Sequence, residues 1–206
     1  TWAPFLESDF PELASHEKGV TYRWPKMKAR DLRQMVWIRE LCDKIQQRPI
    51  KVGCHGMHEW AMVYEMTADE VRHQGYQLRM EPSELKRFVD SQSVTCTHYD
   101  AFRFFTPSAV PLNAYAPSLE TRLMLEQGGC LHANMDLYKW SYKLWPWIGS
   151  DMVADAFALA LEGRVLDMEA SPYDLVDLGF APLCLETEEG RAQYREKQSQ
   201  LAAKSA

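Results

Sequence analysis

The chain has 206 residues, 46% of them hydrophobic and 12% aromatic, which is enough to bury the core of one globular domain. Its 29 acidic and 23 basic residues give a net charge of −6, the wrong sign for neutralising nucleic-acid phosphates, so we expect a small-molecule substrate rather than duplex DNA as the partner. No segment approaches the roughly 18–20 apolar residues needed to span a bilayer, and no secretory signal opens the chain. This predicts an intracellular protein without membrane insertion, in the cytoplasm or an organelle interior.

The N-terminal quarter divides into an irregular segment and a helix. Residues 1–27 contain three prolines and little periodicity, so we expect an extended N-terminal arm or linker. Apolar residues then recur at helical spacing over residues 29–47, and Pro49 ends this helix.

The middle of the chain predicts shorter elements. A glycine-containing turn at residues 53–56 precedes a helix expected over residues 57–66. β-forming residues cluster at 76–80 and 94–99, on either side of a short helix, and predict a small sheet. Residues 102–113 are aromatic and contain prolines, which favours a packed loop.

The C-terminal half predicts longer helices. Glycines, prolines and capping side chains delimit helices over residues 117–127, 131–144, 150–168 and 187–200. The sequence therefore predicts a mainly α fold, of the α+β type with a small minor sheet, in which residues 28–200 form a single compact helical domain.

Two histidines and a glutamate surround the start of the helix that follows the glycine turn. In the run G-C-H-G-M-H-E-W over residues 53–60, His55 and His58 are three positions apart and Glu59 follows the second. This pattern could ligate a metal or hold a catalytic base, although a zinc-protease motif would need its second histidine at Met62. The alternative is structural, since a carboxylate is stabilised by the macrodipole at a helix N-terminus.

A second group occupies residues 96–103, with the sequence C-T-H-Y-D-A-F-R. In an extended strand His98 and Asp100 point to the same side, and Arg103 could join them. A histidine–aspartate pair fixes the imidazole tautomer and raises its basicity, which serves both a general base and a metal ligand. The alternative is an ion pair at a strand end, but the neighbouring phenylalanines favour burial and a functional role.

The third group is a polar stripe along the helix expected at residues 131–144. The stripe, at intervals of four, three and four residues, consists of His132, Asp136, Lys139 and Lys143. Such a stripe either faces solvent or lines a site. The aromatic neighbours Tyr138 and Trp140 could border a pocket, which favours the second interpretation.

These three groups supply the candidate functional residues. The candidate catalytic residues are Glu59, His98, Asp100, His132 and Asp136. The candidate substrate-binding residues are Arg103, Tyr138, Lys139 and Trp140. The candidate metal ligands are His55, His58, His98 and His132, and mixed imidazole and carboxylate ligands suit zinc or iron. Farther along the chain, Asp174 could approach the histidines after the long helix turns back.

Four longer runs resemble a known family. They are G-C-H-G-M-H-E-W-A-M-V-Y (53–64), C-T-H-Y-D-A-F-R-F-F-T-P (96–107), L-E-Q-G-G-C-L-H-A-N-M-D-L-Y-K-W-S-Y-K-L (125–144) and L-D-M-E-A-S-P-Y-D-L (166–175). Over most of residues 30–197 the chain is similar to a family of largely uncharacterised bacterial proteins often labelled 3-methyladenine DNA glycosylase. The resemblance implies N-glycosidic cleavage and a further N-terminal segment. The chain has no readable glycine-rich hairpin and is net acidic, which are both at odds with gripping DNA.

Three functional hypotheses remain open. The first is a hydrolase-type, N-glycosidase-like enzyme for a nucleobase-like or other small planar substrate, with Glu59 or Asp100 as base and His98 and His132 as acid or orienting groups. The second is a metal-dependent enzyme that uses zinc or non-haem iron. The third is an enzyme-derived structural subunit of a larger assembly, whose motif residues would lack an open pocket.

Overall fold

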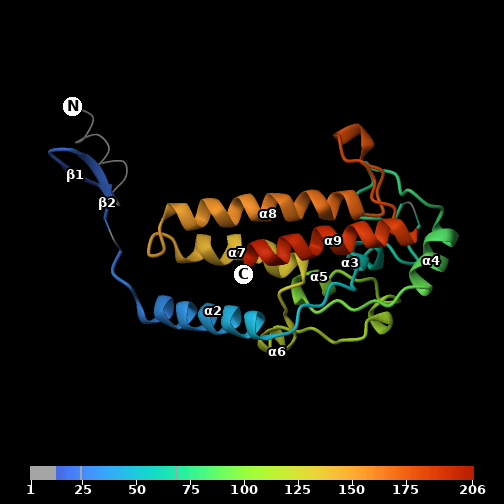
Figure 1. Cartoon of the computed structure of the whole chain (residues 1–206), viewed down its shortest axis with the longest axis horizontal. Coiled ribbons are helices and arrows are strands. Elements are labelled where there is room, and N and C mark those ends of the chain that lie inside the picture. Colours follow the sequence, from blue (N-terminus) through green and yellow to red (C-terminus); the bar gives the residue numbers. More distant parts are fainter. Residues whose placement is uncertain (1–12, 24, 68) are drawn as a thin grey trace.

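The computed structural model describes residues 13–23, 25–67 and 69–206, and it confirms the mainly α class. The longest helices are α2 (Ala29–Gln47), α7 (Leu131–Leu144), α8 (Ser150–Ala170) and α9 (Glu188–Ser205). Helix α7 packs against both α8 and α9, while α2 lies along another side of α7 (Figure 1). Among the described residues, no helix is both long and apolar enough to cross a bilayer.

A β-hairpin that the sequence analysis did not predict precedes the helical body. Its strands, β1 (Leu13–His16) and β2 (Gly19–Tyr22), pair in antiparallel register, with Leu13 opposite Tyr22. The hairpin lies within the segment expected to be an extended arm, and it stands apart from the helices (Figure 1).

The small sheet expected on either side of α4 (Pro82–Asp90) does not form, so that prediction was wrong. Leu78 instead makes an isolated bridge to Tyr173, and Val94 makes one to Asn113. Val94 is buried and Leu78 packs against the core. The apolar pattern of these segments therefore reflects loops packed on the helices and not strand pairing.

Short elements connect the long helices and carry much of the polar interior. They are α3 (Met57–Ala61), α5 (Tyr99–Phe102), η1 (Val110–Leu112), α6 (Arg122–Leu125) and η2 (Val176–Leu178). Helix α3 is shorter than expected because the chain leaves the helix before Glu65, which has a left-handed φ of 56°. Helix α6 is shorter because Ser118 and Thr121 bond each other's backbone N–H groups, which favours a turn over a helix.

The main hydrophobic core lies where α3 meets α8. Trp60 is fully buried, its indole N–H donates to the Ala170 carbonyl at 2.9 Å, and its ring meets Phe88 edge-on with centroids 4.7 Å apart. A smaller cluster joins α2 to α7 through Leu41 and Trp140. These contacts hold α3 against α8 and α2 against α7, and α7 also packs on α8, so the polar side chains of α3, α7 and α8 are held in position.

We expect Gly190→Ala to destabilise the protein. A Cβ atom at this position would lie 1.9 Å from the backbone oxygen of Cys184, in the turn that leads into α9. From the usual cost of overpacking we expect a loss of about 3 kcal/mol in the free energy of unfolding, measured by chemical denaturation. Gly75→Ala is the matched control, because nothing lies within 4 Å of its added Cβ. Equal stability of the two variants would contradict the close packing of α9 against this turn.

Candidate functional site

Three of the predicted histidines converge inside the helical body. His58 comes from α3, His98 from the residue before α5, and His132 from α7. The centroid of the His132 ring lies 4.4 Å from that of His58 and 5.5 Å from that of His98. Side chains from three distant stretches of chain therefore meet at His132, which joins two groups of ionisable residues.

The first group consists of His58, His132 and Asp167. The Oδ1 atom of Asp167, on α8, lies 2.8 Å from His58 Nε2, and these side chains are only 1% and 6% exposed. One nitrogen or oxygen atom from each of the three residues lies within 4.8 Å of the others. Arg164, one helical turn earlier on α8, donates to the second oxygen of Asp167 at 3.0 Å.

Burial and ion pairing give the residues of the first group and the neighbouring Glu59 different pKa values. Burial alone would raise the pKa of Asp167, but the charge of His58 and its hydrogen bond lower it to about 2. Burial, aided by the charge of His58, lowers the pKa of His132 to about 3, so this imidazole is neutral at pH 7. Burial and the Asp167 carboxylate raise the pKa of Glu59 to about 7. Two neighbouring carboxyl groups thus differ widely in proton affinity.

A pocket of about 790 Å³ opens beside the first group. Glu59, His132 and Asp167 all contribute to its wall. The aromatic residues that line it are His73, Tyr76, Phe104, Phe105 and Tyr173. Its volume falls within the range of about 300–1,000 Å³ that is typical of small-molecule sites. A ligand in this pocket would contact ionisable groups and flat apolar surfaces at once.

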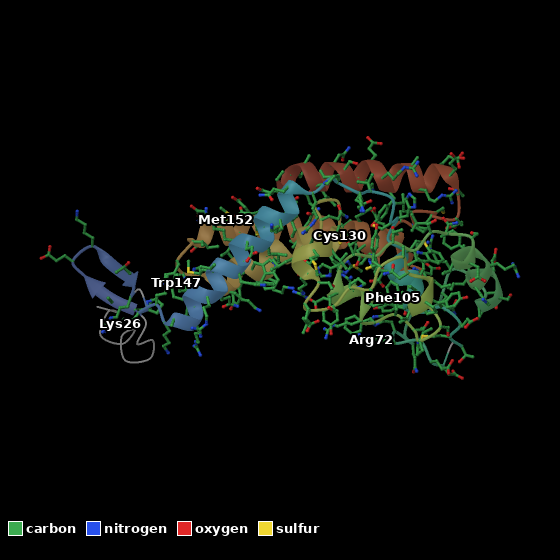
Figure 2. The ribbon with its side chains drawn as sticks, turned by 90° about the horizontal axis from the view of Figure 1, so that it is seen from below. Lys26, Arg72, Phe105, Cys130, Trp147 and Met152 are labelled. Atoms are coloured by element: carbon green, nitrogen blue, oxygen red, sulfur yellow. The ribbon has the colours of Figure 1, made fainter. Side chains whose placement is uncertain are left out.

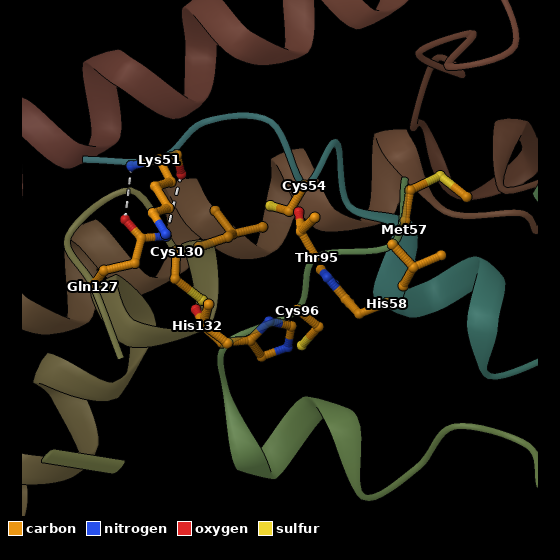
Figure 3. Close-up of a pocket in the computed structure, with 12 residues that line it drawn as sticks. Lys51, Cys54, Met57, His58, Thr95, Cys96, Gln127, Cys130 and His132 are labelled. Atoms are coloured by element: carbon orange, nitrogen blue, oxygen red, sulfur yellow. Dashed lines mark hydrogen bonds between the residues drawn. The ribbon is translucent and has the colours of Figure 1, made fainter. Parts of the chain in front are cut away.

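A much smaller cavity, of about 30 Å³, adjoins His58 and His132 (Figure 3). Cys54, Cys96 and Cys130 contribute to its wall, and all five cysteines of the chain are free. Burial raises the pKa of Cys96 to about 12, so its thiol stays protonated. The cavity has room for only about one or two water molecules, and we regard it as a small space behind His58 and His132 and not as a ligand site.

The second group surrounds His98 on another flank of His132. His98 Nε2 lies 3.1 Å from Asp136 Oδ2 and 3.7 Å from Glu126 Oε1. Burial raises the pKa of Glu126, and among the described residues neither of its carboxyl oxygens has a hydrogen-bond partner. Both observations favour the protonated, uncharged form of Glu126.

Two cations neutralise the carboxylates of the second group. Lys139 bonds Asp136 and also Asp100, the latter at 3.1 Å, while Arg122 bonds Asp100 from α6. Burial would raise the pKa of Asp100, but the hydrogen bonds from Arg122 and Lys139 lower it to about 2. The ammonium group beside Asp136 already stands where a metal ion would have to bind. The second group is therefore a charge-balanced network and a poor cation site.

The predicted residues divide between the pocket and the network behind it. Glu59, Asp100, Arg103 and His132 line the large pocket. His98, Asp136 and Lys139 belong to the second group. The extended backbone expected through Asp100 ends at His98, because α5 begins at the next residue. The side chains of His98 and Asp100 are linked indirectly: His98 contacts Asp136, and Lys139 bonds both Asp136 and Asp100.

Three predicted residues belong to neither the first nor the second group and do not line the large pocket. His55 has a φ of 46°, which turns its ring towards α9, where its Nε2 lies 3.1 Å from Arg195 Nη1. Tyr138 packs against Phe157, with ring centroids 5.0 Å apart. Trp140 packs edge-on against Trp37 at 5.4 Å, in the smaller core cluster, and does not line the large pocket, although Lys139 Nζ of the second group lies 4.2 Å from the centroid of its ring.

Sequence reasoning missed Asp167, Glu126 and Arg122. Asp167 takes the place beside His58 that Asp174 was expected to approach, while Asp174 accepts a hydrogen bond from the Val176 backbone at 3.1 Å. The available signal for Asp167 was a single carboxylate between two apolar residues on a long helix. Such a residue on a buried face needs a partner, but the sequence does not say which one.

Comparisons with models of known protein families, with curated proteins and with solved structures find no match. The function therefore has to be argued from the chemistry of the site. Two imidazoles and two carboxyl groups beside one pocket can bind a divalent cation, orient a water molecule and transfer a proton to or from a ligand.

We expect Asp100→Asn to lower stability, because it leaves Arg122 and Lys139 without their shared carboxylate. The folded pKa of Asp100, about 2, lies below the usual aspartate value of 3.8, so the stabilisation is present above pH 4 and is lost as the pH falls towards 2. Allowing for solvent screening of a side chain that is 32% exposed, we expect a loss of about 1 kcal/mol at pH 7.

Urea unfolding of both proteins between pH 7 and pH 2 measures this difference. Asp177→Asn, at an exposed carboxylate on η2, is the control and should behave like the parent protein. A stability difference between parent and Asp100→Asn that stays constant down to pH 2 would contradict the assigned role of Asp100.

Proposed function

We propose that this chain is a metal-dependent hydrolase whose metal site is formed by His58, His132 and Asp167. The observation that carries the proposal is their convergence, with one possible ligand atom from each within 4.8 Å of the others, beside a pocket of about 790 Å³. Zinc binds histidine nitrogen and carboxylate oxygen at about 2.0–2.2 Å, so atoms bound to one ion lie roughly 3–4 Å apart. His58 Nε2 and Asp167 Oδ1, at 2.8 Å, are close to that spacing.

The composition of the site suits zinc or iron(II). Two histidines and one carboxylate leave coordination positions open for water and substrate, which is typical of catalytic rather than structural metal sites. Arg164 bonds the second oxygen of Asp167, and such a contact fixes the orientation of a ligating carboxylate. His98, next to the His132 ring and bonded to Asp136, would hold His132 in place from the other side.

Glu59 is the residue that we propose to move the proton. It follows His58 in α3 and lines the same pocket as His132 and Asp167. A divalent ion in the site would supply Lewis acidity towards a water molecule. Glu59 would accept the proton of that water as its oxygen bonds to a substrate carbon. As the carbon–nitrogen bond breaks, its electron pair stays on nitrogen, which then takes the proton from Glu59.

Two further considerations support a carbon–nitrogen bond in a small planar substrate. Phe104, Tyr76 and Tyr173 offer flat surfaces in the pocket on which a heterocycle can stack. The resemblance to proteins labelled as DNA glycosylases is in keeping with N-glycosidic cleavage, here of a nucleoside-sized compound. The open pocket argues against the hypothesis of an enzyme-derived structural subunit, which would have no use for it.

Protein purified without chelator should contain about one equivalent of zinc or iron, measured by inductively coupled plasma mass spectrometry. His132→Ala and Asp167→Asn should each lower metal content by on the order of tenfold or more, because each removes one of three ligands. His73→Ala is the matched control, since His73 lines the pocket but does not belong to the first group. Circular dichroism and thermal melting establish that each variant is folded before metal contents are compared.

A folded parent protein that holds neither zinc nor iron(II), even after reconstitution, would contradict the metal site. Metal content that is unchanged in both variants would contradict the assigned ligands.

Glu59→Gln should leave the metal content unchanged and abolish proton transfer. With a panel of nucleosides and nucleotides as substrates, we expect hydrolysis to fall by about 10²-fold or more, read by chromatography of the released base. Glu162→Gln, at an exposed glutamate on α8, should retain full activity. Hydrolysis that persists in Glu59→Gln at the parental rate would contradict the role of Glu59.

A further inference from the structure

Besides the carboxyl groups of Glu59, Asp100 and Asp167, the pocket wall carries arginines, two of which the proposed reaction does not use. Arg72, Arg103 and Arg164 all contribute to its wall, although the chain as a whole carries a net charge of −6. Arg164 is engaged with Asp167 at 3.0 Å. Arg72 and Arg103 lie in a different part of the wall, around Phe104, and the proposed reaction gives them no role.

Neither Arg72 nor Arg103 has a carboxylate of its own. Within the described part of the chain, Arg72 makes no salt bridge. Arg103 makes a long ion pair through Nε with Asp100 Oδ1, at 3.7 Å and beyond hydrogen-bond range, while Arg122 and Lys139 bond Asp100 Oδ2. Both guanidinium groups therefore keep N–H donors for a ligand.

Arg72 and Arg103 both lie against the ring of Phe104. The guanidinium carbons of Arg72 and Arg103 lie 5.1 Å and 4.6 Å from the Phe104 ring centroid. Stacking on a ring orients an arginine without consuming its in-plane donors. Arg72 and Arg103 are exposed whereas Phe105 is buried, and Figure 2 labels Arg72 nearer the edge of the molecule than Phe105, so the arginines lie at the outer side of the pocket. An anion bound at this side of the pocket would offset the repulsion between the two like charges.

We infer that the pocket binds a nucleoside monophosphate, with the phosphate at Arg72 and Arg103 and the heterocycle among the aromatic side chains. The forked donors of arginine match phosphate oxygens in pairs, which a neutral nucleoside lacks. The inference rests on the proposed function, because it assigns the substrate class of the same site. A single nucleotide is favoured over a nucleic-acid strand, because the protein is net acidic and the described arginines of the site are confined to the wall of this pocket.

Isothermal titration calorimetry tests the inference with AMP, GMP, CMP and UMP against the four matching nucleosides. At least one monophosphate should bind about tenfold or more tightly than its nucleoside. In the double variant Arg72→Gln/Arg103→Gln this advantage should fall below about threefold, while the affinity for the nucleoside stays unchanged. Arg87→Gln, at an exposed arginine of α4 outside the pocket, is the control and should bind as the parent does.

Several outcomes would overturn the inference. They are equal binding of nucleotides and nucleosides, no binding of either, an equal loss for both in the double variant, and tighter binding of a single-stranded oligonucleotide than of any monophosphate. These results are separate from the test of the proposed function. Hydrolysis of a neutral nucleoside by metal-loaded protein would preserve the proposed function and overturn the phosphate assignment. Tight nucleotide binding by folded protein that takes up neither zinc nor iron(II), even after reconstitution, would do the reverse.

Discussion

The buried contact between His58 and Asp167 is the interaction on which the arrangement of the site depends. It joins α3 to α8 across 109 residues of chain, with both side chains almost completely removed from water. A carboxylate buried alone would cost several kcal/mol, and the imidazole and Arg164 together offset that cost. Because Glu59 follows His58 in the same short helix, the contact that neutralises Asp167 also directs Glu59 to the pocket wall.

The two groups that meet at His132 differ in how their charges are satisfied. The second group contains its own cations, so Asp100 and Asp136 are paired with Lys139 within the fold. The first group reaches the pocket and relies on histidine and on Arg164, whose side chain is 57% exposed. Carboxylates that are paired with cations inside the fold are held in place, whereas a group that reaches the pocket can exchange partners with a ligand. This division of roles makes the second group a support for the first.

The long helices could be predicted from the sequence because their periodicity is local. The expected bounds of α2 and α7 agree with the structure, since each carries a regular apolar stripe and a clear stop. The short elements could not be predicted in the same way. Side-chain bonds between Ser118 and Thr121 shorten α6, and burial gives two loops the composition of strands.

The site shows the same limit. The sequence indicated that His58, His98 and His132 gather, since each belongs to a polar group in an apolar setting, and their rings do meet. It could not assign Asp167, because a contact between residues so far apart leaves no local pattern. It also grouped His55 with His58 on spacing alone, whereas left-handed backbone at His55 and Gly56 turns the first ring away.

The position of the hairpin has a practical consequence for attaching this protein to surfaces or reporters. The hairpin stands clear of the helices that build the pocket (Figure 1), whereas Leu201 and Ala202 of α9 are buried and Gln46 donates to the backbone oxygen of Ala206 at 3.2 Å. A fluorescent label or an immobilising linker on the hairpin would therefore leave the interior undisturbed. The same attachment at the end of α9 would compete with side chains that fasten this helix to its neighbours.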